Sequence, residues 1–599
     1  MTTFETELER DKADKIREVA SRGAAKAAEL GYDSEAIRGF LRHYFRHVDA
    51  LDVDERSVEE LLGLVTSHYE LAMHRPSARA TIAIRTPGQS DDGWTSGATV
   101  VQIVTDDRPF LVDSVTMEVL RQGWSIREVF HPQFLVDRDL GGTLHDILRP
   151  DQADAASPRR GTGEQPVHAV AESWMHLEIL PPSGQGHPDQ LAAALEQGLR
   201  EVLRLVEEAV EDWAKMQHRA QETVALLRDE SLPADRRTEA DTAAELLDWL
   251  AQNHFTFLGY REYRYQAADS ATDTPARYVS VPATGLGILR ADVDLPGSFH
   301  ALPVLARPQL MVITKDNHKS RVHRPAYLDY LGIRLLDADG AIIGERRFLG
   351  LFASTAYSEA VGRIPLLRQK AQEVLRRSRY DESSHGGKAI MDVLDTYPRD
   401  ELFQAPIDEL APAVEKVAHL KERRQVRLFV RRDAYGRYLS CLVYLPRDRY
   451  TTAVRNKMQD ILLDRVGGST IDFTARVTES VLARLHFVVA MPEGATVGEV
   501  DVRALERELT LATRSWNDGF AELLSGAENP DVLATMMGSL PEGYKEDYLP
   551  HQGILDLQAL LGLSGPDDMA MAMYRPDRPD DDASSRTSLG QAARCEDAR

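Results

Sequence analysis

The chain has 599 residues, too many for one hydrophobic core, and its length predicts roughly three to five domains. Hydrophobic residues make up 43% and charged residues 28% of the sequence, as in an ordinary globular protein. Asp plus Glu number 95 against 71 Lys plus Arg, and the resulting formal charge of −24 excludes nucleic acid and anionic membranes as expected partners.

The first predicted region, residues 1–92, is mostly helical. Its start, MTTFETELERDK, is charged and lacks the apolar run of a signal peptide. Ile37, Leu41 and Phe45 recur at four-residue intervals, which is typical of one buried helical face. A strand is expected at ATIAIRT (80–86), followed by a linker.

The second predicted region, 98–222, has the order strand, helix, strand, strand, helix. The strand ATVVQIVTDD leads into a helix, whose apolar stripe comprises Leu111, Val112, Val115, Val119 and Leu120. Pro109 suits the first turn of this helix and Gly123 suits its C-terminal end. Strands are predicted at IREVFHPQFLVDRD and VAESWMHLEIL, and a long helix at 189–221. The order predicts a ferredoxin-like domain.

Residues 240–360 form the third predicted region, which is mixed α+β. A helix at TAAELLDWLAQNH precedes the strands FTFLGYREYRY and LMVITKD, and DADG (337–340) is expected to turn a hairpin. This pattern predicts a PAS- or GAF-like sensory module. A helical connector is predicted over 361–422.

The fourth region, 423–525, repeats the plan of the second. Strands with alternating apolar residues flank a helix at TTAVRNKMQDILLDRV; the alternating residues include Ile471, Phe473, Ala475, Val477, Leu485, Phe487, Val489 and Met491. A last helix is expected at 501–524, which completes a second ferredoxin-like domain. Residues 526–599 are predicted to be a truncated segment with a disordered tail after Tyr574.

Most motifs that would indicate catalysis are incomplete. Gly285-Leu286-Gly287 lacks the third glycine and the following helix of a dinucleotide site, so we interpret it as a turn at a strand. SSHGGKAIMD (383–392) departs from a phosphate loop at two positions and is interpreted as a break before a helix. His43 and His47 lack a third metal ligand. No catalytic, cofactor or metal residue is therefore predicted.

Only Cys441 and Cys595 are present, which excludes a disulfide framework and a Cys-rich metal centre. No run reaches the ~18 apolar residues of a membrane helix. The sequence therefore predicts a cytoplasmic protein.

The junction TDDRPFLVDS (105–114) offers backbone N–H groups and short polar side chains at a helix start. Two interpretations are open. The junction binds a ligand, or Asp107 and its neighbours only cap the helix.

This junction resembles the first strand-to-helix turn of ACT domains, which are amino-acid-sensing modules with the pattern D-R-P-G-x-L. Asp107, Arg108, Pro109 and Leu111 correspond to it, Leu111 one position early, and Phe110 replaces the glycine that permits close approach of the ligand. The resemblance implies an amino-acid effector and a ligand site formed by Asp106, Asp107, Arg108, Phe110 and Asp113.

Longer stretches resemble the N-terminal segment of the large bacterial NAD-specific glutamate dehydrogenases. They include NHFTFLGYREY, VHRPAYLDYLGIR, SHGGKAIMDVLDTYPRDELFQ and YKEDYLPHQGILDL, and they are collinear over about 40–575. The resemblance implies an α+β multidomain protein with ACT-type antiparallel units, a PAS-like unit and helical connectors, which assembles and regulates an oligomer.

In this family the dehydrogenase module, which oxidises L-glutamate to 2-oxoglutarate and ammonia with NAD⁺, follows in a longer chain. We therefore expect a truncated chain that is inactive alone, with NAD bound only by the full-length protein. The expected partners are further copies of the chain or the dehydrogenase region. The alternative is a free-standing ACT-type regulator that binds an amino acid.

Overall fold

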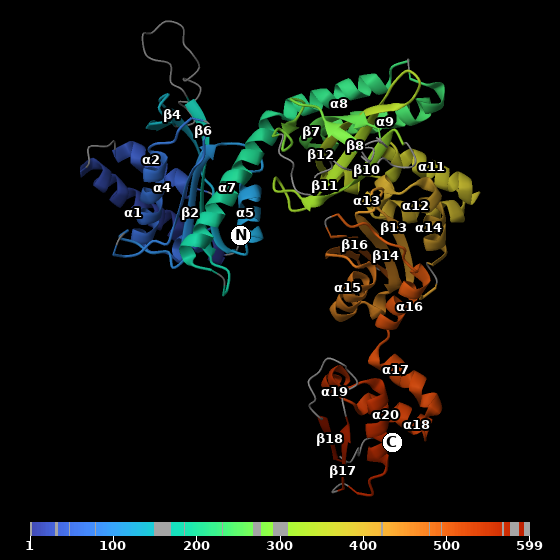
Figure 1. Cartoon of the computed structure of the whole chain (residues 1–599). Coiled ribbons are helices and arrows are strands. Elements are labelled where there is room, and N and C mark those ends of the chain that lie inside the picture. The colour runs from blue at the N-terminus through green and yellow to red at the C-terminus, as the bar shows by residue number, and fades with distance from the viewer. Residues whose placement is uncertain are drawn as a thin grey trace. The chain divides into compact units, whose positions relative to one another are not determined.

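In a computed structural model of the chain, the described residues are 3–29, 34–46, 48–77, 79–90, 92–148, 169–184, 186–230, 232–267, 277–291, 309–420, 423–478, 480–492, 494–565, 568–574 and 586–591. They divide into two compact units, coloured along the chain in Figure 1. One comprises Met1–Lys370 with Arg399–Gln404, and the other comprises Ala371–Pro398 with Ala405–Arg599.

The first unit begins with four helices and an antiparallel sheet of order β1-β2-β6-β4-β5, in which β3 also pairs with β6. The helices are α1 (Thr3–Glu29), α2 (Ser34–Tyr44), α3 (Ala50–Asp54) and α4 (Val58–Ala72). The strands are β1 (Thr81–Arg85), β2 (Thr99–Asp106), β3 (Ser125–Phe130), β4 (Gln133–Arg138), β5 (Leu144–Leu148) and β6 (Ala169–Leu180). Helices α5 (Leu111–Arg121) and α7 (Pro188–Glu211) lie on the opposite side of the sheet from α1, α2 and α4 (Figure 1).

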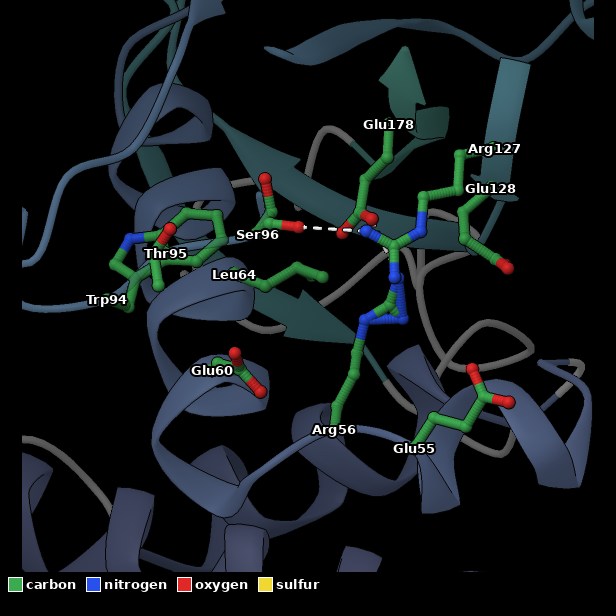
Figure 2. Close-up of a pocket in the computed structure, with 10 residues that line it drawn as sticks. All are labelled: Glu55, Arg56, Glu60, Leu64, Trp94, Thr95, Ser96, Arg127, Glu128 and Glu178. Carbon is green, nitrogen blue, oxygen red and sulfur yellow. Dashed lines mark hydrogen bonds and ion pairs between the residues drawn. The ribbon is translucent and has the colours of Figure 1, made fainter. Parts of the chain in front are cut away.

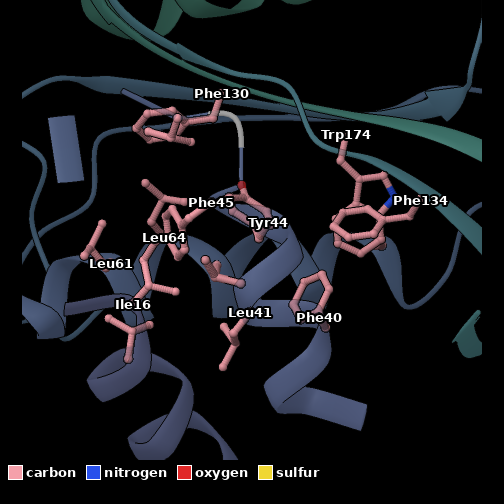
Figure 3. Packing of buried hydrophobic residues seen from close by; sticks show 14 of the residues in the cluster. Ile16, Phe40, Leu41, Tyr44, Phe45, Leu61, Leu64, Phe130, Phe134 and Trp174 are labelled. Carbon is pink, nitrogen blue, oxygen red and sulfur yellow. The ribbon is translucent and has the colours of Figure 1, made fainter. Parts of the chain in front are cut away.

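The core beneath α1–α4 is rich in aromatic side chains (Figure 3). Phe40 of α2 packs against Phe134 of β4 and Trp174 of β6, with ring centres 5.2 and 5.7 Å apart. Leu41 and Phe45 are buried, which confirms the predicted helical face. The N-terminal helices therefore share one core with the sheet and complete its second covered face.

Three details of the second predicted region differ from expectation. The strand predicted at IREVFHPQFLVDRD divides into β3 and β4 around His131-Pro132, because proline has no N–H for the ladder. The long helix ends at Glu211, and α8 (Trp213–Leu227) follows. Leu120 is 57% exposed, whereas Leu111, Val115 and Val119 are buried as predicted.

The rest of the first unit is built on a second antiparallel sheet of order β10-β11-β12-β7-β8, with β9 beside β7. Its elements are α9 (Arg237–Trp249), β7 (Phe255–Gln266), β8 (Arg277–Ser280), β9 (Leu286–Gly287), β10 (Met311–Lys319), β11 (Tyr327–Leu336), β12 (Ile342–Phe352), α10 (Ser354–Ser358) and α13 (Arg399–Gln404). Asp337–Gly340 turns the β11–β12 hairpin as predicted. The PAS- or GAF-like class of this region stays a prediction.

Helix α11 (Leu367–Ser378) spans the division between the units, and the second unit contains α12 (His385–Thr396) and α14 (Ile407–Leu420). An antiparallel sheet of order β13-β14-β16-β15 follows. Its elements are β13 (Arg427–Arg432), β14 (Tyr438–Pro446), α15 (Thr452–Val466), β15 (Thr470–Arg476), β16 (Leu482–Ala490) and α16 (Val502–Ala512). Leu485, Phe487 and Val489 of β16 are fully buried, but Phe473 and Ala475 of the edge strand β15 and Val477 just after it are exposed, unlike the buried face predicted for them.

The end of the chain is more ordered than predicted. The helix expected at 501–524 is two helices, α16 and α17 (Trp516–Leu523). Further elements are α18 (Pro530–Met536), α19 (Glu542–Asp547), α20 (Pro550–Leu561), β17 (Met569–Tyr574) and β18 (Arg586–Gln591). Phe520, Leu533, Ile554 and Leu557 form a small core. The β17–β18 pairing contradicts a tail that is disordered throughout, and residues 575–585 and 592–599 lie outside the described residues.

Candidate ligand-binding site

Phe110 takes a backbone conformation that favours glycine at the junction of β2 and α5. It is the residue before the first turn of α5, with φ of 71° and ψ of 3°. Its carbonyl accepts hydrogen bonds from the N–H of Ser114 at 3.0 Å and from the Ser114 hydroxyl at 2.6 Å. For a residue with a Cβ atom this left-handed conformation costs about 1–2 kcal/mol. Phe110 therefore takes the left-handed conformation at the position where the D-R-P-G-x-L pattern has glycine.

Capping by Asp107 does not occur. No side chain caps α5. Instead, the Asp107 N–H donates to the Ala171 carbonyl at 2.8 Å, and its carboxylate accepts from the Gln133 side-chain amide at 3.0 Å. The capping interpretation is wrong for this residue, because Asp107 is bound to β4 and β6.

Asp106 belongs to a buried charge network centred on Glu172. Arg75 donates to Asp106 at 2.6 Å and to Glu172 at 2.8 Å. Arg138 donates to both oxygens of Glu172, at 2.6 and 2.9 Å, and the Trp174 indole N–H donates at 3.0 Å. Glu172 is fully buried and fully paired. The network fixes the position of Asp106 at the end of β2. One oxygen of Asp106 binds Arg75, and the other faces Arg108.

Arg108 joins the junction to helix α7. Its guanidinium lies 3.5 Å from Asp106, 3.0 Å from Glu207 and 3.6 Å from Glu211. Burial raises the pKa of Glu207 even though Arg108 opposes the shift. Arg108 is thus the central cation of an acidic cluster.

Asp106 and Arg108 line a cavity of about 200 Å³. The remaining lining residues are Arg79, Ala80, Thr105, Leu111, Arg200, Leu203, Arg204 and Glu207. The structure brings together only Asp106 and Arg108 of the five predicted residues. Asp107 and Phe110 lie outside the lining, and Asp113 is exposed on the first turn of α5.

Sequence reasoning missed Arg79, Arg200, Arg204 and Glu207. The last three come from α7, and Arg200 and Arg204 are one helical turn apart, a spacing that indicates a shared face. Four guanidinium groups and two carboxylates suit a small ligand that carries a carboxylate, because arginine pairs with carboxylates through two parallel hydrogen bonds.

A second pocket, of about 100 Å³, lies between the N-terminal helices and the sheet (Figure 2). Arg56 donates to Glu178 at 2.8 Å, and Arg127 donates to the Ser96 carbonyl at 3.1 Å. Burial and the nearby charge of Asp52 raise the pKa of Glu128 to about 7. The space holds only a few water molecules. Arg56 and Glu178 form an ion pair in it, and we assign it a structural role.

The other motifs form ordinary structure. Gly285 precedes the short strand β9, which Leu286 and Gly287 form, so this segment belongs to a strand as interpreted from the sequence. Ser384 caps α12 by accepting from the Gly387 N–H, so the glycines of 383–392 lie in the first helical turn. The ring of His43 contacts the Gln133 carbonyl at 3.0 Å, and His47 lies outside the described residues.

The described part of the chain holds no group of three His, Cys, Asp or Glu side chains placed to bind a metal ion. None of its helices combines the length and apolar composition that a membrane span needs.

Three models of glutamate dehydrogenase domains match the chain in order. The ACT1 domain matches residues 40–195, helical motif 1 matches 364–423, and the ACT2 domain matches 427–517. The NAD-specific glutamate dehydrogenase of Pseudomonas aeruginosa is 37% identical over 547 residues, or 90% of this chain and 32% of that protein. The chain belongs to the NAD-specific glutamate dehydrogenase family.

Two further NAD-specific glutamate dehydrogenases support the assignment. The protein of Halomonas elongata is 33% identical over 90% of this chain and 33% of its own length. The protein of Mycobacterium tuberculosis is 31% identical over 84% of this chain and 29% of its own length. The chain spans about a third of the length of the glutamate dehydrogenases that it matches. The β2–α5 junction lies in its ACT1 domain and β13–β16 in its ACT2 domain.

Proposed function

We propose that these residues form the N-terminal regulatory and assembly segment of a large NAD-dependent glutamate dehydrogenase. The proposed reaction of the whole protein converts L-glutamate, NAD⁺ and water to 2-oxoglutarate, ammonia and NADH. The ordered matches to ACT1, helical motif 1 and ACT2 carry this proposal. It includes a cytoplasmic location, for which the low cysteine content is the support.

The proposal places the NAD site and the catalytic residues in a part of the protein outside these 599 residues. Hydride transfer requires a nicotinamide held within a few ångströms of the substrate, together with a base. The test is an assay of glutamate-dependent NAD⁺ reduction by the purified chain, with the full-length Pseudomonas aeruginosa protein as positive control. No turnover is expected, and turnover at an enzyme-like rate would refute this part of the proposal.

We propose further that the β2–α5 junction binds an amino-acid effector, with Asp106 and Arg108 as contact residues and Asp107, Phe110 and Asp113 as supporting ones. The cavity beside Asp106 and Arg108 supports the first two assignments. Thermal shift with a panel of amino acids tests this. Arg108→Met should abolish a shift, and Arg127→Met, an exposed arginine of the neighbouring strand β3, is the control.

Assembly is the second part of the proposed role, through further copies of the chain or through the dehydrogenase region. Open sheets such as β13-β14-β16-β15 leave unpaired backbone groups at their edges, and these groups favour association. Light scattering of the purified chain should report a species larger than a monomer. A monomer that binds an amino acid and shows no affinity for a dehydrogenase region would instead favour a free-standing regulator.

A further inference from the structure

One face of the sheet β10-β11-β12-β7-β8 carries a buried group of charged residues. Arg261, Arg334 and Arg347 are at most 2% exposed, and Glu345 is 0% exposed. The opposite face packs on α8, where Arg346 donates to the Thr223 hydroxyl at 3.0 Å. Because successive side chains of a strand alternate between faces, the group lies on the side away from α8.

Strand register brings these residues into two adjacent rows. Arg334 of β11 is opposite Glu345 of β12, and Glu345 is opposite Tyr263 of β7. In the next row of the same face, Arg347 is opposite both Gly332 of β11 and Arg261 of β7. Directly opposite side chains have Cβ atoms roughly 4.5–5.5 Å apart. Arg334 and Glu345 are therefore immediate neighbours.

Two of the three arginines have partners. Arg261 donates to the carbonyls of Leu289 at 2.6 Å and Ala291 at 2.8 Å. Arg347 donates to Oε1 of Glu345 at 2.9 Å, and its guanidinium lies 3.7 Å from the centre of the Tyr263 ring. The hydroxyl of Tyr330 also donates to Oε1 of Glu345.

Arg334 and the second oxygen of Glu345 have no such partners. None of the three guanidinium nitrogens of Arg334 has a hydrogen-bond partner among the described residues, and neither has Oε2 of Glu345. A buried cation is costly unless an anion and hydrogen-bond acceptors compensate it. The unpaired cation and the unpaired carboxylate oxygen belong to directly opposite residues of two paired strands, so the sheet presents one acceptor and one group of donors close together.

Gly332 leaves room for the side chains of Tyr330 and Glu345 beside this pair. A Cβ atom at Gly332 would lie 2.9 Å from the Tyr330 hydroxyl and 3.0 Å from Cδ of Glu345. The glycine therefore lets the Tyr330 and Glu345 side chains lie against the strand. There the Tyr330 hydroxyl holds the Glu345 carboxylate in place.

We propose that Arg334 and Glu345 form a binding site for a free α-amino acid. The ligand carboxylate pairs with the guanidinium of Arg334, and its ammonium group donates to Oε2 of Glu345. An α-amino acid carries both groups on one carbon, which matches neighbouring residues of two paired strands. This site is separate from the β2–α5 junction, and the proposal does not depend on the dehydrogenase assignment.

Calorimetric titration of the purified full chain with single amino acids tests the site. Propionate and succinate, which lack an amine, and methylamine, which lacks a carboxylate, are titrated in parallel. At least one amino acid should bind, and Arg334→Met should weaken its binding roughly tenfold or more. Arg264→Met is the matched control, because Arg264 is an exposed arginine of β7 in the same sheet. The affinity of the Arg264→Met protein for the amino acid should equal that of the parent protein.

The ligand-free protein gives a second readout, which separates binding from a structural role. Because Arg334 has no hydrogen-bond partner within the described part of the chain, Arg334→Met should keep or raise the melting temperature while the amino-acid-dependent shift disappears. A lower melting temperature of ligand-free Arg334→Met would show a structural role and overturn the proposal. Amino-acid affinity unchanged in Arg334→Met, or no binding of any amino acid, would overturn it as well.

Two comparisons complete the test. Propionate that binds as tightly as the amino acid would refute the role of Glu345. Binding that is lost in Arg108→Met but retained in Arg334→Met would locate the amino acid at the β2–α5 junction, which refutes this inference and leaves the proposed function intact.

Discussion

The rings of Phe110 and His323 lie 4.6 Å apart between centres, at an angle of 38°. Phe110 immediately precedes α5 in the ACT1 domain, and His323 lies in the turn between β10 and β11. The His323 N–H donates to the Ser114 hydroxyl at 3.1 Å, and Arg321 of the same turn pairs with buried Glu118 at 3.2 Å. The start of α5 is therefore in contact with the sheet that carries Arg334 and Glu345, which gives two proposed amino-acid sites a shared structural link.

Phe110 offers a test of backbone strain. Phe110→Ala keeps the Cβ atom in the left-handed conformation and loses the ring contact, whereas Phe110→Gly loses the same contact but relieves the strain. The alanine variant should therefore be less stable than the glycine variant by about 1 kcal/mol. Urea unfolding of both proteins measures the difference. Equal stability would mean that the turn relaxes when the ring is removed.

Glu172 offers a test of the buried charge network. Glu172→Gln removes the carboxylate that Arg75 and Arg138 share and leaves buried guanidinium charge behind. The free energy of unfolding should fall by about 3–5 kcal/mol, as when one partner of a buried ion pair is lost. Glu196→Gln is the control, since Glu196 pairs with Arg200 on the exposed face of α7 at 2.6 Å and should cost less than about 0.5 kcal/mol. Thermal and urea unfolding give both values.

Glu128 offers a test of pH dependence. Its pKa is raised to about 7 by burial and by Asp52, so the folded protein favours the protonated form more than the unfolded chain does. This contribution is fully present below the ordinary glutamate pKa and is lost as the pH rises to about 7. Glu128→Gln should therefore be more stable than the parent protein at pH 8 and similar to it at pH 4.5.

The matched control for Glu128 is Glu55→Gln, which removes an exposed carboxylate from the same pocket. Melting temperatures of the three proteins, measured between pH 4.5 and pH 8.5, check the prediction. A parent protein and a Glu128→Gln variant that differ equally at every pH would contradict it.

Gly63 offers a test of helix packing. It lies inside α4, where alanine is normally the better helix former by about 1 kcal/mol. A Cβ atom at this position would lie 2.2 Å from Cγ of buried Trp94. Gly63→Ala should therefore destabilise the protein by about 1–3 kcal/mol, the cost of overpacking a core. Gly39→Ala in α2 is the control, because nothing lies within 4 Å of its Cβ position. That variant should be as stable as the parent or more stable.

Local pattern predicted much of the fold but only part of the candidate site. Asp106 and Arg108 were predicted from a motif of consecutive residues, and they do line a cavity. Arg200, Arg204 and Glu207 line the same cavity from α7, and no local pattern connects them to the motif. Leu120 fits the apolar period of α5 yet is exposed, because periodicity does not define how wide the contact with the sheet is.

The sequence by itself determined the family, the ACT-type element order and the buried stripe of Leu111, Val115 and Val119. Residue spacing within one element decides which face is apolar, and that information is local. Only the tertiary structure decided that Arg75 and Arg138 share Glu172, and that Arg334 stands beside Glu345 without a bond to it. Arg75, Arg138 and Glu172 are distant in sequence, whereas Arg334 and Glu345 lie on the two strands of one hairpin. In both groups, strand register and burial set which charges meet and which stay unpaired.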